Sequence, residues 1–164
     1  MVTKEKESVD WFIGKARTAA GYRRNIVDNV EHSRSVTAIG RMYFFFYDPK
    51  HKKTLPIYDR FPLVFPIERY GDGFLGLNLH YLDQGNRAGL LNRLSDYKNN
   101  KKYDETTKLR LSYDLLASTK VMRLAQPCIK RYLFGHVRSQ FTEIPAGEWE
   151  KAIALPVELF VKKV

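Results

Sequence analysis

Apolar residues recur at helical spacing near the start of the chain. The run behind Thr3 and Ser8, either of which could cap a helix, predicts an amphipathic helix that Gly21 would end. Its buried side would hold Val9, Phe12, Ile13, Ala16 and Ala19 or Ala20. A second periodic run, Ile26, Val27 and Val30, predicts another short helix before Gly40.

From residue 41 to residue 82 the pattern changes to short runs rich in aromatic and β-branched residues, which favour strands. These runs are MYFFFY at 42–47, FPLVFPI at 61–67 and FLGLNLHYL at 74–82. Asp72-Gly73 between two of them indicates a hairpin turn. In the last run, Phe74, Gly76, Asn78 and His80 would share one face. Proline cannot donate to a β ladder, so Pro62 and Pro66 predict a strand at a sheet edge or one bent by a bulge.

Helical and extended patterns alternate in the second half of the chain. Asp83 can cap a helix that runs to about Leu94, and Asp104 a helix that runs to about Thr119. The second of these would bury Leu109, Leu111, Tyr113, Leu115 and Leu116. Residues 129–144 read as a strand pair or as one strand broken around Gly135. A short helix after Pro145 and a last strand at Val157, Leu159 and Val161 would close the chain.

Together these elements predict an α+β fold. A small antiparallel SH3-like sheet or barrel at about 41–82, with later strands near 129–144, would pack against N-terminal and C-terminal helices. The chain has 164 residues, of which 44% are hydrophobic, which suits one domain over 1–164 with one core. Within it, 1–40 would be a helical segment and 41–164 the strand module.

Cysteine content and hydropathy predict a cytosolic protein. Cys128 is the one cysteine, so an internal disulfide is impossible and a reducing compartment is expected. The first residues mix both charge signs, unlike a signal peptide, and no apolar run reaches the length of a membrane span.

The chain is basic, and its charge is uneven. It holds 28 Lys and Arg against 18 Asp and Glu, a net charge of +10, and no acidic residue occurs from Leu115 to Thr142. Such a surface attracts phosphates or an acidic protein, and charge alone does not distinguish them. The rings at Tyr132 and Phe134 could stack bases beside these charges, or could be core. The candidate contact residues are Lys50, Lys52, Lys53, Lys120, Arg123, Lys130, Arg131 and Arg138.

No motif in the sequence indicates catalysis, a metal or a nucleotide cofactor. The four histidines are far apart, and no glycine-rich loop matches a phosphate-binding pattern. Cys128 with His136 is a weak nucleophile candidate, and His80, near Asn78 and Asp83, is expected to be structural. Four acidic residues, Asp48, Asp59, Glu68 and Asp72, occur in turn-like contexts that explain them without proton transfer.

Several stretches resemble a family of small basic proteins from T-even-type tailed phages, including those of marine cyanobacteria. They cover about residues 41–155: FFFYDPKHKKTLPIYDRFPLVFPI at 44–67, GFLGLNLHYL at 73–82, NNKKYDETTKLRLSYDLL at 99–116, PCIKRYLFGHVRSQF at 127–141 and the EW at 148–149. This resemblance implies a virion or assembly component, or a protein that handles packaged DNA. It implies no catalytic residues.

The leading functional hypothesis is therefore a non-enzymatic structural or assembly protein of the tail, baseplate or head-tail connector. It would contact other phage proteins through its basic surface, in the host cytoplasm during assembly and then in the virion. One alternative is a DNA-binding protein of genome packaging or DNA-end protection. A second is a ribonuclease-like protein with an SH3-like barrel, for which Arg60 and His80 are the candidate residues.

Overall fold

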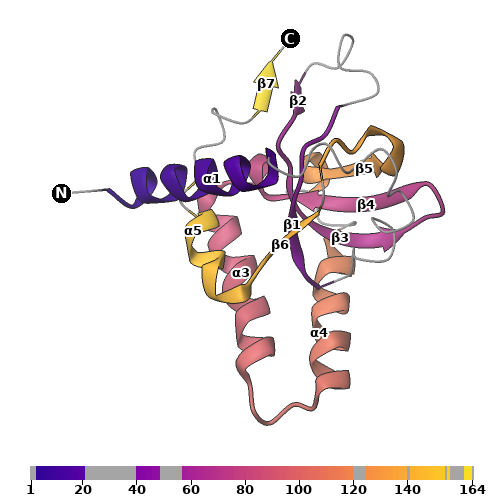
Figure 1. Ribbon diagram of the computed structural model, residues 1–164. Helices are drawn as coiled ribbons and strands as arrows, with labels where there is room; N and C mark the ends of the chain where they lie inside the picture. The colour runs from indigo at the N-terminus through magenta and orange to yellow at the C-terminus, as the bar shows by residue number, and fades with distance from the viewer. Residues whose placement is uncertain are drawn as a thin grey trace.

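The computed structural model describes residues 3–20, 40–48, 57–119, 125–139, 141–153, 155 and 161–163 (Figure 1). These form an α+β fold, as predicted. Its helices are α1 (Lys4–Ala20), α3 (Gln84–Asn99), α4 (Glu105–Ser118) and α5 (Trp149–Ile153). Its strands are β1 (Met42–Phe44), β2 (Ile57–Asp59), β3 (Leu63–Arg69), β4 (Gly73–Asn78), β5 (Ile129–Leu133), β6 (Thr142–Ile144) and β7 (Val161–Lys163). The predicted helix at Ile26, Val27 and Val30 lies outside the described residues.

The main sheet has five antiparallel strands in the order β5-β4-β3-β1-β6, and β2 and β7 pair separately. β3 is the central strand, so the edge position predicted from its prolines is wrong. The alternative, a bulge, is confirmed, because the β3–β4 register shifts between Pro66 and Glu68. With β5 and β6 at its edges, the ladder of described strands is open and does not confirm an SH3-like barrel.

Residues 129–144 form two strands with an interruption around Gly135, and these strands do not pair with each other. β5 and β6 lie at opposite edges of the sheet, and a short turn at Phe134–His136 interrupts the chain after β5. Beyond this turn, Val137 makes a single bridge to Tyr47, and β6 then pairs with β1. The segment thereby covers one face of the sheet.

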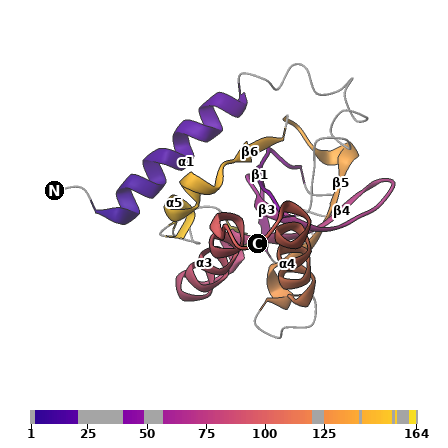
Figure 2. The same cartoon turned by 90° about the horizontal axis from the view of Figure 1, so that it is seen from below.

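Successive side chains of the strands point to opposite faces of the sheet and enter two separate buried clusters. Met42, Phe44, Leu63, Phe65 and Leu77 point toward the helices and pack with Phe12, Leu91, Leu116 and Trp149. Figures 1 and 2 show α1, α3, α4 and α5 gathered on that side of the sheet. The second cluster, on the other face, is Phe45, Tyr47, Val64, Phe74, Tyr132, Phe134 and Val137, with Phe141 against it.

Three of the predicted helix starts are confirmed. The Thr3 hydroxyl oxygen accepts from the Lys6 amide, and the carboxylates of Asp83 and Asp104 cap α3 and α4. The hydrogen bond from the Asn86 amide lowers the pKa of Asp83, and that from the Thr107 amide lowers the pKa of Asp104. Among the described helices, none combines the length and hydropathy needed to cross a bilayer.

Two local predictions are wrong for identifiable reasons. Leu109 and Tyr113 are 64% and 46% exposed, because the α3–α4 hairpin projects beyond the sheet and only the end of α4 reaches the core (Figure 1). The strand predicted to run to residue 82 ends at Asn78, whose side-chain oxygen accepts from the His80 amide at 2.9 Å. This bond starts a short turn at Leu79–Tyr81 that removes His80 from the strand alternation.

Candidate nucleic-acid interface

Residues 46–48, which precede a lysine-rich segment, contact residues 136–138 of the later basic stretch. The Asp48 amide donates to the His136 carbonyl at 2.9 Å, and the Arg138 amide donates to the Phe46 carbonyl at 2.8 Å. Asp48 directly precedes the segment that carries Lys50, Lys52 and Lys53, which itself lies outside the described residues. Arg138 belongs to the acid-free stretch 115–142. The fold thus places Asp48, the last described residue before the lysine-rich segment, beside the later basic stretch.

The Arg138 guanidinium is partly exposed and is held mainly by backbone. Its Nη1 donates to the carbonyls of Gly135 and Val137 at 2.7 and 3.3 Å, while Nη2 is 3.8 Å from the Asp48 carboxylate. Because that ion pair is long and open to water, it neutralises little of the charge. Arg138 can therefore still attract a phosphate.

On the other side of residues 46–48, Arg60 and Phe61 form the corner between β2 and β3. The Tyr47 amide donates to the Arg60 carbonyl at 3.0 Å. Arg60 is exposed, and Phe61 is 37% exposed. Since residues 46–48 hydrogen-bond to both and lie between them, like a strand between its neighbours, the backbones at Arg60 and Arg138 are about 10 Å apart. We call Asp48, Arg60, Phe61, His136 and Arg138 the cationic corner.

A buried carboxylate anchors this corner. One oxygen of Asp59 accepts from the Phe61 amide at 2.8 Å. The other lies 2.5 Å from His80 Nδ1 and accepts from Asn78 Nδ2 at 3.0 Å. The Tyr132 hydroxyl is 3.1 Å from the same Asn78 nitrogen, and burial raises its pKa well above the usual value. Asp59 therefore combines the predicted turn chemistry with a polar network that the sequence did not indicate.

Lys130 and Arg131 lie on β5, apart from the corner. The Lys130 ammonium is 4.9 Å from the centre of the Tyr81 ring. The Arg131 guanidinium lies over the Tyr70 ring at 4.4 Å and contacts the Asp72 carboxylate at 2.8 Å. Both positions can still meet phosphate.

The rings beside these charges in sequence do not form a stacking surface. Tyr132 and Phe134 are each 4% exposed, within the second cluster, so the core interpretation of these rings is correct. Lys120 and Arg123 lie outside the described residues.

The weak catalytic candidates are not assembled into a site. Burial raises the pKa of Cys128 to about 11, and the whole of β5 separates this thiol from His136. His80 is fully buried against Asp59, not Asp83, so it cannot reach an RNA substrate beside the exposed Arg60. Among the described residues, no three His, Cys, Asp or Glu side chains are grouped to hold a metal ion.

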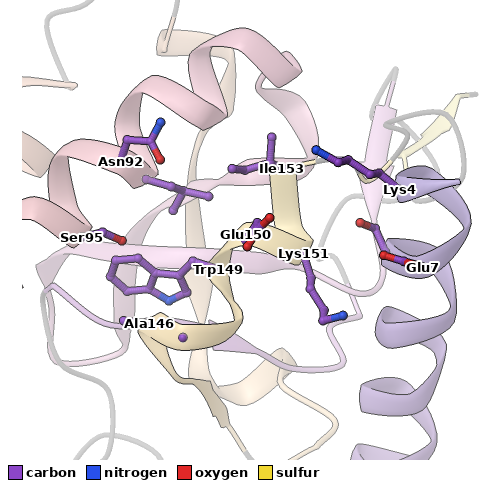
Figure 3. Close-up of a pocket in the computed structure, with 12 residues that line it drawn as sticks. Lys4, Glu7, Asn92, Ser95, Ala146, Trp149, Glu150, Lys151 and Ile153 are labelled. Atoms are coloured by element: carbon purple, nitrogen blue, oxygen red, sulfur yellow. The ribbon is translucent and has the colours of Figure 1, made fainter.

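A hollow of about 600 Å³ opens between α1, α3 and α5 (Figure 3). Lys4 and Glu7 on α1 and Glu150 and Lys151 on α5 contribute opposite charges in equal number. Without an excess of positive charge, this hollow has no net attraction for phosphate. The cationic corner is the better candidate for an anionic partner.

These features define a small basic α+β protein whose candidate contact surface is cationic. The chain belongs to the phage T4 terminal DNA protecting protein family, whose family model matches residues 3–164. Neither the curated proteins nor the solved structures give a match.

The family confirms the predicted kinship with T-even-type phages. Its description concerns DNA termini, so it favours the DNA-end alternative over the structural role that led the sequence-based hypotheses. The likeness to SH3-like ribonucleases has no support from it.

Proposed function

We propose that this protein binds the ends of double-stranded DNA and shields them from enzymes that require a free end. The observation that carries the proposal is the family match, which covers the chain from residue 3 to residue 164. The net charge of +10 and the cationic corner agree with a polyanionic partner.

The proposed contact surface combines described and sequence-inferred positions. Arg60 and Arg138 flank residues 46–48, and the lysines of the following segment, Lys50, Lys52 and Lys53, would extend the same positive end. Lys130 and Arg131 on β5, with Lys120 and Arg123, would add contacts along the backbone of the duplex. Lys and Arg side chains that neutralise phosphates release counterions, so binding should weaken steeply with salt.

The deciding experiment compares linear and covalently closed DNA of the same sequence. Purified protein at micromolar concentration is mixed with an end-labelled linear duplex at about 50 and about 200 mM salt. Binding is measured by mobility shift against closed-circular competitor, and protection by digestion with an exonuclease that starts at ends. We expect linear DNA to be preferred and its digestion to be slowed. Equal competition by circles together with unprotected ends would overturn the proposal.

Charge variants test the surface independently of the fold. Arg60→Gln and Arg138→Gln together should reduce the slope of log affinity against log salt by about 2, since each phosphate contact contributes about 0.9. Arg93→Gln and Arg110→Gln are the matched control, because both arginines are exposed on the helical side. If the slope of log affinity against log salt falls equally in both double variants, the cationic corner is not the DNA-binding surface.

A second candidate, the structural or assembly role, has one observation in its favour. Leu109 and Tyr113 form an exposed apolar surface on the projecting α3–α4 hairpin, which a neighbouring phage protein would cover. Copurification with washed phage particles tests this role. A protein that remains in the lysate, absent from particles, would leave DNA binding as its function.

A further inference from the structure

A DNA end differs from the interior of a duplex in one large chemical feature. The terminal base pair has an open, flat face that no neighbouring pair covers, whereas an interior site presents backbone and groove edges. Aromatic side chains bind such faces by stacking, with little regard to sequence. A protein that selects ends, as proposed above, therefore benefits from an exposed ring beside positive charge.

Among the described residues, the most exposed aromatic rings belong to Phe61, Tyr103 and Tyr113. Tyr103 lies between Lys101, Lys102 and Asp104, Glu105, and Tyr113 lies between Arg110 and Asp114, so the charges beside each of these two rings balance. Phe61 instead follows the exposed Arg60 and precedes a buried proline. Charge complementarity singles out Phe61.

Phe61 is also held in place before any ligand arrives. Its amide donates to the Asp59 carboxylate. The side chains of His80 and Asn78 hold that carboxylate in place by hydrogen bonds. The Phe61 ring packs edge-on against the buried ring of Phe46, with 5.2 Å between centroids and 81° between planes. Since the ring is already ordered, little conformational entropy is lost when a base pair stacks on it.

We propose that Phe61 is the end-recognition residue, stacking on the terminal base pair while Arg60 contacts the phosphate next to it. The inference rests on the proposed function and adds to it the chemical group that the protein recognises. It also gives the buried Asp59 network a role, because that network holds the Phe61 ring at the surface of the cationic corner.

The test uses a leucine substitution that separates stacking from packing. Phe61→Leu keeps an apolar contact with Phe46 but has no aromatic face, and Phe61→Trp enlarges that face. Tyr113→Leu is the matched control at another exposed ring. Each protein is titrated into linear duplexes with 2-aminopurine at the terminal pair or at an internal pair, and end preference is measured by competition with closed circles.

We expect Phe61→Leu to lose about 5- to 150-fold in preference for ends, the range for one stacked base. Its salt-dependent binding to circles should persist. Terminal 2-aminopurine should be quenched by wild type, Phe61→Trp and Tyr113→Leu, but not by Phe61→Leu. If Phe61→Leu instead keeps the wild-type end preference and quenching, the inference is wrong while end binding stands. If wild type itself shows no end preference, the proposed function fails first.

Discussion

The strongest test of the packing concerns Arg87, a fully buried arginine in the first turn of α3. Its Nε donates to the Leu82 carbonyl at 2.7 Å. Its Nη1 donates to the carbonyls of Ala152, Ile153 and Leu155 at 3.0, 3.1 and 2.6 Å. The guanidinium therefore joins α3 to the C-terminal end of α5, where the helix dipole favours a positive charge.

Replacing Arg87 with Met keeps most of the apolar stem and removes every donor. A hydrogen bond to a charged group contributes about 1.5–3 kcal/mol, and a buried carbonyl left without a donor costs about 1–3 kcal/mol. The Met variant no longer buries a charge, which offsets part of this loss. We therefore expect the free energy of unfolding to fall by about 2–4 kcal/mol, and the Tm by about 4–16 °C for a chain of this size.

Urea unfolding followed by tryptophan fluorescence and far-ultraviolet circular dichroism measures this loss. Arg93→Met is the matched control, since Arg93 lies on the same helix, is exposed and donates a hydrogen bond to the Tyr97 hydroxyl at 3.3 Å. We expect the control to change stability by less than about 0.5 kcal/mol. If Arg87→Met is as stable as the control, the guanidinium does not hold α5 in place.

Three further predictions concern other buried contacts. Gly73→Ala should lower the unfolding free energy by more than about 2 kcal/mol in thermal melts, because its Cβ would lie 1.9 Å from a backbone oxygen of β5. Gly71→Ala, with nothing within 4 Å, should be neutral. The Cys128 thiol, with its pKa raised to about 11 by burial, should be alkylated at pH 8 about 100-fold more slowly in the folded protein than in urea. Asp59→Ala should cost about 3–5 kcal/mol by leaving buried donors without an acceptor, whereas the exposed Asp72→Ala should cost less than about 1 kcal/mol. Equal stability within either pair, or equal alkylation rates, would contradict the corresponding prediction.

The sequence alone predicted only part of the candidate site. Arg138 was predicted as a contact residue, and it lies in the cationic corner. Phe61 was placed only in the predicted strand run at 61–67, because nothing in the sequence shows which of many aromatic residues will remain exposed. The interleaved rings Tyr132 and Phe134 allowed either a stacking surface or a core position, and their burial shows that they are core.

Features determined by a few adjacent residues could be read from the sequence. The caps at Thr3, Asp83 and Asp104 and the turn before Gly73 depend on hydrogen bonds within three or four residues. The bulge at Pro66 follows from the missing amide hydrogen of proline. Such local chemistry acts wherever the segment finally packs.

Tertiary structure decided which residues lie at the surface and which residues distant in sequence contact one another. Leu109 has the spacing of a core residue but is exposed, because α4 extends past the sheet, while Arg87 is buried because α5 supplies carbonyls from 65 or more positions away. Likewise, Asp59 meets His80, and Asp48 meets Arg138, only when the strands between them are paired. Periodicity reports which side of an element is apolar, whereas burial depends on whether another element reaches that side.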